Sequence, residues 1–377
     1  MKKLFKVNKY IISSVALLLY LIVINRASYL ASLVFLMLLL VFFLMYKGKL
    51  TNIKIILVFI SFFYFFMGIL NGNLFSDIFK DFICFTPLIL FVADDRQFYE
   101  NFIDNKLAGL NRIMPYLLLA SIGLFIYMGY SWTVSSEARF AYDQESKLNL
   151  FAPISPLFMI PFMLCYTDVK YNRLFIYIGT FFILFMGYLT QTKTVFIPVI
   201  LPFLLTIIFN KNLISKFRLI IFFFIISGII YFVLSKYAPD SILSFVGKFN
   251  MTDDSNMDRV NESVHYLERC NVLQLLFGRG FGGIKTFSGE EFIGGIDMIH
   301  FGIVHLIMKG GLLLLIIIYF PLLFIIVKDS ISHNYSYVGM VIVIIFKDFG
   351  HTQWQSSTGM LVYWLLVYYR FYIKIQR

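Results

Sequence analysis

The chain has 377 residues, of which 60% are hydrophobic and only 14% are charged, and its mean hydropathy is +0.82. About a quarter of the residues of an ordinary soluble domain are charged, so this composition excludes a water-soluble globular protein and favours an integral membrane protein. The net charge of +11 does not indicate nucleic acid, because in a membrane protein the distribution of lysine and arginine matters before their total.

Apolar segments of roughly span length recur from end to end, which predicts an all-α integral membrane protein with residues 1–377 in a single polytopic domain. We expect about 12 transmembrane helices, within a range of roughly 10–14. With the N-terminus in the cytoplasm, more than half of the 32 lysines and arginines are cytoplasmic, and so is the C-terminus. The apolar segments are 10–24, 29–46, 53–70, 82–93, 115–132, 151–166, 174–190, 195–209, 217–235, 300–327, 335–347 and 357–374.

The longest connection, the extracytoplasmic loop 236–298, lies between the ninth and tenth segments. Ser255 and Asp258 have the spacing of a capping box, and the residues that follow predict an amphipathic helix over 256–269, on the bundle or at the membrane interface. The polar side of this helix has two interpretations. It is either a face that binds substrate or a solvated face on which Arg259 is paired to Glu262. The apolar stripe comprises Met257, Val260, Val264 and Leu267, and the polar side, aimed at water or a cavity, comprises Arg259, Glu262, Tyr266 and Arg269.

A glycine-rich segment, LLFGRGFGG at 275–283, follows this helix. It contains the spacing GxGxxG, but no predicted strand precedes it and no βαβ unit surrounds it, so we reject a dinucleotide site. A glycine-rich turn can direct backbone N–H groups at an anion, and Arg279 with Lys285 would add positive charge. A flexible connection is the alternative.

The tenth apolar segment carries several ionisable groups. Asp297 and His300 lie at its start, and His305 and Lys309 follow inside the apolar run, before the pair Gly310-Gly311. Ionisable groups at membrane depth are costly and are therefore functional candidates. We expect a functional role for His300, near the water boundary, and a core position with a hydrogen bond to a neighbouring helix for His305.

Cationic side chains gather on the extracytoplasmic side in this topology. Lys193, in the sequence TQTKT, and Arg139 could each be simple interfacial residues. Together with the loop cations they would form a basic cavity that suits a diphosphate or an anionic polymer, because guanidinium groups bind phosphate bidentately. The set is Arg139, Lys193, Arg259, Arg279 and Lys285.

The pattern resembles the O-antigen polymerase and ligase superfamily of bacterial envelope polysaccharide assembly, which includes the Wzy-type polymerases. The resemblance rests on the late extracytoplasmic loop, on TQTKT, and on the stretches NMDRVNESVHYLERCNVLQLLFGRGFGG and IDMIHFGIVHLIMKGG. It covers roughly residues 185–315. Lys193 stands where the family often has arginine. Phe301 follows His300 where ligases commonly have asparagine, which favours a polymerase over a ligase.

The resemblance implies a metal-independent glycosyltransferase without a cofactor and with a GT-C-like fold in the bacterial inner (plasma) membrane. Such an enzyme polymerises undecaprenyl-diphosphate-linked repeat units into O-antigen or capsular polysaccharide on the extracytoplasmic face. Membrane lipids, a flippase and a chain-length regulator would be its further partners. An O-antigen ligase and a lipid-linked oligosaccharide flippase or other transporter are the alternatives, and a transporter would not need the long external loop.

The resemblance also implies roles for individual residues. The transfer needs charge stabilisation of the leaving diphosphate and a base near the acceptor hydroxyl. We assign Arg259 and Lys193, with Arg279 in support, to the diphosphate, and His300 or Asp297 to the acceptor. A substrate groove would include Arg139, Glu262, Tyr266 and Lys285.

Overall fold

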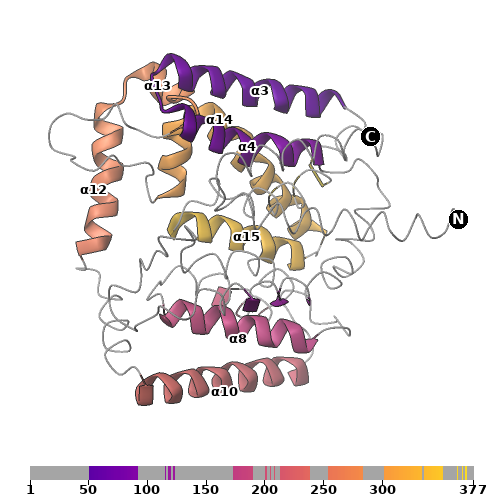
Figure 1. Ribbon diagram of the computed structural model, residues 1–377. Coiled ribbons are helices and arrows are strands. Elements are labelled where there is room, and N and C mark those ends of the chain that lie inside the picture. Colours follow the sequence, from indigo (N-terminus) through magenta and orange to yellow (C-terminus); the bar gives the residue numbers. More distant parts are fainter. Residues whose placement is uncertain are drawn as a thin grey trace, which may run out of the picture. The chain divides into compact units, whose positions relative to one another are not determined.

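A computed structural model describes residues 51–91, 173–189, 213–237, 254–282, 301–332 and 335–350, together with a few positions elsewhere (Figure 1). All regular structure in these residues is helical, as predicted. Two of the helices are long and apolar enough to cross a membrane. The span number of about 12 stays a prediction.

The first described element pair is a helical hairpin. Helix α3, Asn52–Leu70, agrees with the predicted segment 53–70, and helix α4, Phe75–Phe91, returns beside it (Figure 1). α4 begins seven residues before the predicted 82–93, because its first two turns carry polar residues that a hydropathy window excludes. A carboxylate at the start of a helix, here Asp77, is favoured by the partial positive charge of the N-terminus.

Three further long segments within the described residues also form helices close to their predicted bounds. They are α8, Arg173–Leu189; α10, Leu213–Tyr237; and α15, Tyr335–Gly350. The chain divides into two compact units: one holds α8, α10 and the start of α15, and the other holds α3, α4, the loop helices and the tenth segment. The site described below lies within the second unit.

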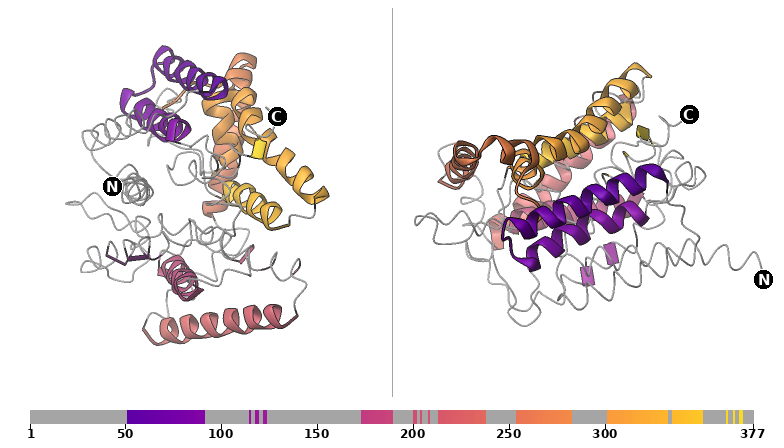
Figure 2. Two further views of the ribbon diagram at one scale, coloured as in Figure 1. Left: turned by 90° about the vertical axis from the view of Figure 1, so that its right-hand side faces the viewer. Right: turned by 90° about the horizontal axis from the view of Figure 1, so that it is seen from above.

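The loop between the ninth and tenth segments contains two helices, of which the first was predicted. Helix α12, Asp254–Arg269, confirms the helix expected over 256–269, and a short helix α13, Val272–Phe277, follows it. Asn271 starts α13 with a reciprocal capping box to Gln274, which satisfies two free backbone N–H groups. α12 runs across the direction of α3 in Figure 1, and the view from above in Figure 2 shows it end-on.

Helix α14, Gly302–Ile331, agrees with the predicted segment 300–327, but it contains a break that was not predicted. Gly311 has φ 63° and ψ −168°, so the helix is interrupted there and has two arms, 302–310 and 312–331. At 1.5 Å per residue the second arm is about 30 Å long and matches a bilayer core, whereas the first, about 13 Å, does not. The apolar sequence hides the break because leucine and isoleucine continue beyond it.

Both arms of α14 meet one carboxylate. A methyl group at Gly302 would lie 2.1 Å from Asp348 Oδ1, and the hydroxyl of Tyr319 donates a hydrogen bond to Asp348 Oδ2. The start of the first arm and the middle of the second arm are therefore within reach of the same side chain, which fixes the bend at Gly311.

Candidate functional site

The glycine-rich turn, residues 278–282, is packed into the break of α14. The amide of Arg279 donates to the carbonyl oxygen of Met308 at 2.8 Å, and the amide of Gly280 donates to that of Lys309 at 2.9 Å. A broken helix leaves carbonyl groups without intrahelical partners, and an irregular backbone at membrane depth is tolerated only where protein buries it. The turn supplies the missing donors.

Tyr64 of α3 connects the same two elements from the other side. Its hydroxyl donates to the carbonyl oxygen of Gly310 at 2.8 Å, and its own carbonyl accepts from the amide of Phe281 at 2.9 Å. The side chain is fully buried. Three successive carbonyl groups at the break thus have partners from the turn and from α3.

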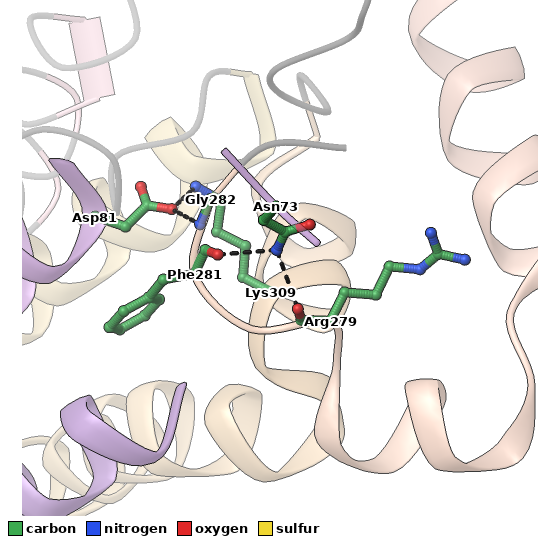
Figure 3. A network of polar contacts seen from close by, with 6 residues as sticks. All are labelled: Asn73, Asp81, Arg279, Phe281, Gly282 and Lys309. Atoms are coloured by element: carbon green, nitrogen blue, oxygen red, sulfur yellow. Dashed lines mark hydrogen bonds and ion pairs between the residues drawn. The ribbon is translucent and has the colours of Figure 1, made fainter. Parts of the chain in front are cut away.

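The α3–α4 connection also binds the turn. The side-chain amides of Asn71 and Asn73 each donate to the carbonyl oxygen of Arg279 at 3.1 Å. Asn73 also donates to that of Phe281 at 2.9 Å, and Figure 3 shows both bonds of Asn73. The turn is therefore fixed through its N–H groups and its carbonyl groups alike. The alternative of a flexible connection is wrong for residues 278–282.

Glycine is required where these backbones touch. At Gly280, with φ 81°, a Cβ atom would lie 2.0 Å from the amide nitrogen of Gly68. At Gly311 a Cβ atom would lie 2.2 Å from the carbonyl oxygen of Leu276. Both contacts are to backbone atoms, which cannot rotate away, so the spacing of glycines in this sequence reflects close helix-to-turn packing.

A buried ion pair joins α4 and α14 beneath the turn. Lys309 and Asp81 form a salt bridge, with exposures of 6% and 7%, and Asp81 Oδ2 also accepts from the amide of Gly282 at 2.8 Å (Figure 3). An isolated buried charge is expensive, but here each charge has its counterion and the carboxylate has a further donor. Lys309 was predicted as a candidate from the sequence, and Asp81 was not.

These bonds correct one expectation about the turn. The four successive N–H groups of residues 279–282 all donate to acceptors of the protein itself. The turn does face an anion, but this anion is the Asp81 carboxylate. The backbone of the turn therefore does not offer its N–H groups to an external phosphate.

A cavity of about 20 Å³ lies beside the ion pair. This volume accommodates about one water molecule, provided that polar partners are present. His305, one helical turn before Lys309, lines it and is buried, which confirms the core position predicted for this histidine. The remaining lining residues are Asp81, Phe85, Phe281, Leu306, Leu314 and Ile318.

The side chain of Arg279 leaves the turn in the direction away from the ion pair (Figure 3). One guanidinium nitrogen, Nη2, lies 3.4 Å from Gln274 Oε1. Partial burial lowers the pKa of Arg279, and the neighbouring Tyr266 opposes this shift. Arginine remains charged nonetheless, so the turn holds a partly desolvated cation on a fixed backbone.

The orientation of α12 differs from the expected one. Tyr266, placed on the side facing water or a cavity, is 2% exposed and packs against Val304, Ile307 and Met308 of α14. An aromatic ring has a large apolar area to bury and turns this side of the helix inward. Burial also raises the pKa of Tyr266. The described residues of the apolar stripe are exposed instead: Val260 55%, Val264 46% and Leu267 41%.

Of the predicted site residues, the structure brings Arg279 and Tyr266 together, and Glu262 lies partly exposed on α12. Arg259 belongs to α12, but its side chain is outside the described part of the chain. A signal for the missed Asp81 was present in the sequence, since it directly precedes an apolar segment. The predicted residues outside the described ranges are Arg139, Lys193, Lys285, Asp297 and His300.

Comparisons with protein-family models, with curated proteins and with solved structures give no match. The class of the protein therefore follows from its own fold. It is a helical chain in which α3 and α14 are long and apolar enough to cross a membrane.

Proposed function

We propose that this chain is a multi-span glycosyltransferase of the bacterial plasma membrane that polymerises lipid-diphosphate-linked oligosaccharide repeat units on the extracytoplasmic face. The observation that carries the proposal is the fixed position of Arg279, whose backbone is clamped between α3 and α14 while its guanidinium points away from the buried ion pair. A preorganised cation of this kind suits the developing charge of a leaving diphosphate.

The contacts of the turn support the topology that the proposal requires. In the predicted arrangement, the α3–α4 connection and the loop before α14 lie on the same, extracytoplasmic side. Asn71 and Asn73 of the connection are hydrogen-bonded to the turn of the loop, as two segments on one side of a membrane can be. Arg279 would then lie at the water-facing end of the α3–α4 hairpin.

The proposed reaction forms one glycosidic bond and breaks one phosphate ester bond. The anomeric carbon of the growing chain separates from the oxygen of its lipid diphosphate and bonds to a hydroxyl oxygen of the next lipid-linked repeat unit. The acceptor proton goes to a base, and the diphosphate leaves with its negative charge. Arg279, with Arg259 and Lys193, would bind the diphosphate, and His300 or Asp297 would take the proton.

A flippase for the same lipid-linked oligosaccharides is the second candidate. The buried pair of Asp81 and Lys309, with His305 beside a water-sized cavity, favours it, because ionisable groups at membrane depth mark ion or proton pathways in many transporters. The clamped turn and the helices of the external loop favour the polymerase.

Deletion of the gene separates the two candidates. For a polymerase, gel profiles of surface glycan should lose the ladder of long chains and retain single repeat units on the surface acceptor. For a flippase, single repeat units should accumulate on the cytoplasmic side and the surface should lose both forms. Long chains of unchanged distribution in the deletion strain would rule out both.

A further inference from the structure

We propose that Asp81 is a positioning residue that sets the direction of Arg279 by fixing the end of the glycine-rich turn. The use of Arg279 for a diphosphate rests on the function proposed above, but the positioning itself does not. Asp81 Oδ2 accepts from the amide of Gly282, three residues after Arg279, at 2.8 Å.

The carboxylate connects three elements at one point. It belongs to α4, it is paired with Lys309 next to the break of α14, and it holds Gly282 at the end of the turn (Figure 3). The amides of Arg279 and Gly280 fix the start of the turn on α14. Asp81 fixes its end on α4, so the path of the backbone through Arg279 is set from both sides.

Steric packing around Gly282 makes this end of the turn sensitive to small movements. With φ 103°, a Cβ atom there would lie 2.8 Å from Ile78 Cγ1 and 2.9 Å from Asn73 Cβ. Asn73 in turn donates to the carbonyl of Arg279. Loss of the Gly282 hydrogen bond would therefore displace the contact that orients the neighbouring peptide group of Arg279.

The carboxylate of Asp81 has two roles that can be tested separately. Its charge neutralises the buried Lys309, and its oxygen accepts the hydrogen bond of Gly282. The single variant Asp81→Asn would leave a buried ammonium group without its counterion, which is strongly destabilising. Paired variants that neutralise both positions remove this problem, because replacing both partners of a buried ion pair is often tolerated.

Two paired variants differ in whether position 81 can accept a hydrogen bond. Asp81→Asn with Lys309→Met removes both charges and keeps an oxygen that can accept from Gly282. Asp81→Leu with Lys309→Met removes the charges and the acceptor and keeps the branched shape of the side chain. Asp77→Asn, one helical turn earlier on α4, is the matched control for loss of an aspartate from this helix.

The measured quantity is the rate at which phenylglyoxal, an arginine-specific reagent, modifies Arg279 in the full chain in native membranes, followed by mass spectrometry of the peptide. Arg218, exposed on α10, serves as the internal reference. We expect the rate in the Asn/Met variant to stay within about twofold of wild type and the rate in the Leu/Met variant to rise about tenfold, because an unsatisfied buried N–H destabilises the closed turn. The Asp77→Asn rate should match wild type.

Equal rates in the two paired variants would overturn the proposal, since the Gly282 hydrogen bond would then not control Arg279. The function is judged separately, by the glycan profile of an Arg279→Ala strain. If the rates differ as expected while that strain makes wild-type glycan, the positioning stands and the function fails. If the rates are equal while that strain loses long chains, the function stands and the positioning fails.

Discussion

At the level of single residues, the second compact unit contains buried polar groups that are hydrogen-bonded or ion-paired to one another. Asp81, Lys309 and the amide of Gly282 satisfy one another in a buried place, and Tyr64 donates to one neighbour and accepts from another. Arg279 differs from these groups because its guanidinium leaves the network. Changes to the network should therefore affect stability and the position of Arg279, whereas changes to Arg279 itself should affect function.

Removal of the Arg279 guanidinium tests this division. We expect Arg279→Ala to abolish long-chain surface glycan, and Arg279→Lys to retain a small fraction, because an ammonium group binds a diphosphate as a point charge without bidentate geometry. Gel profiling of the glycan, with membrane levels of the protein measured in parallel, checks the result. Arg218→Ala on α10, an exposed arginine of the other unit, is the matched control and should leave the ladder unchanged.

Breaking the ion pair should destabilise the protein. Lys309→Met leaves the Asp81 carboxylate buried without its counterion and should lower the free energy of unfolding by about 3–5 kcal/mol. Adding Asp81→Asn should recover most of this loss, because both charges are then absent. Thermal unfolding of the detergent-purified protein, followed by size-exclusion chromatography, measures both effects. A double variant no more stable than the single variant would contradict the role of the pair.

At the level of elements, the break in α14 and the glycine-rich turn form one unit. A helix break exposes carbonyl groups, and the turn supplies donors at the same place, so each element satisfies backbone groups that the other would leave without a partner. Sequence periodicity predicts the helices but not this pairing. It requires contacts between residues more than two hundred positions apart in the chain, such as Tyr64 with Gly310.

Two glycines with similar φ angles allow the effect of backbone strain to be distinguished from the effect of steric packing. Gly280 and Gly72 have φ 81° and 73°, but only at Gly280 would a Cβ atom meet neighbouring atoms within 4 Å. We expect Gly72→Ala to cost about 1–2 kcal/mol from backbone strain, and Gly280→Ala at least about 3 kcal/mol, because the collision with α3 is added. Unfolding midpoints of the two variants measure the difference. Equal midpoints would show that α3 does not confine the turn.

At the level of the whole molecule, the orientation of the helices across the membrane can be tested. α3 and the second arm of α14 are both long enough to cross a bilayer core. Leu74, in the α3–α4 connection, and Lys328, near the C-terminal end of α14, are both exposed and lie on opposite sides of the membrane in the predicted topology. The two positions therefore report on the orientation of the entire chain.

Cysteine labelling of intact cells tests this topology. A membrane-impermeant maleimide should label Leu74→Cys from outside and should label Lys328→Cys only after the membrane is opened. The unsubstituted protein, with its three native cysteines, gives the background. Labelling of Lys328→Cys in sealed cells would reverse the orientation and place Arg279 on the cytoplasmic side, where the proposed reaction does not occur.

Local sequence patterns were sufficient to predict the helical class, the bounds of α3, α8 and α10 to within a few residues, and the helix in the long loop. These follow from local hydropathy and helical spacing, which depend on neighbouring residues alone. The sequence also pointed to Arg279, to Lys309 and to the glycines around them.

The way in which these parts combine depends on tertiary contacts. Gly311 breaks α14 because backbone from the α13 end approaches too closely for a side chain. Tyr266 turns inward because α14 offers it an apolar surface. The anion that the glycine-rich turn faces is Asp81, a residue from a distant helix. Each of these features depends on contacts between segments that are distant in the sequence. The periodicity of hydrophobic residues contains no information about such contacts.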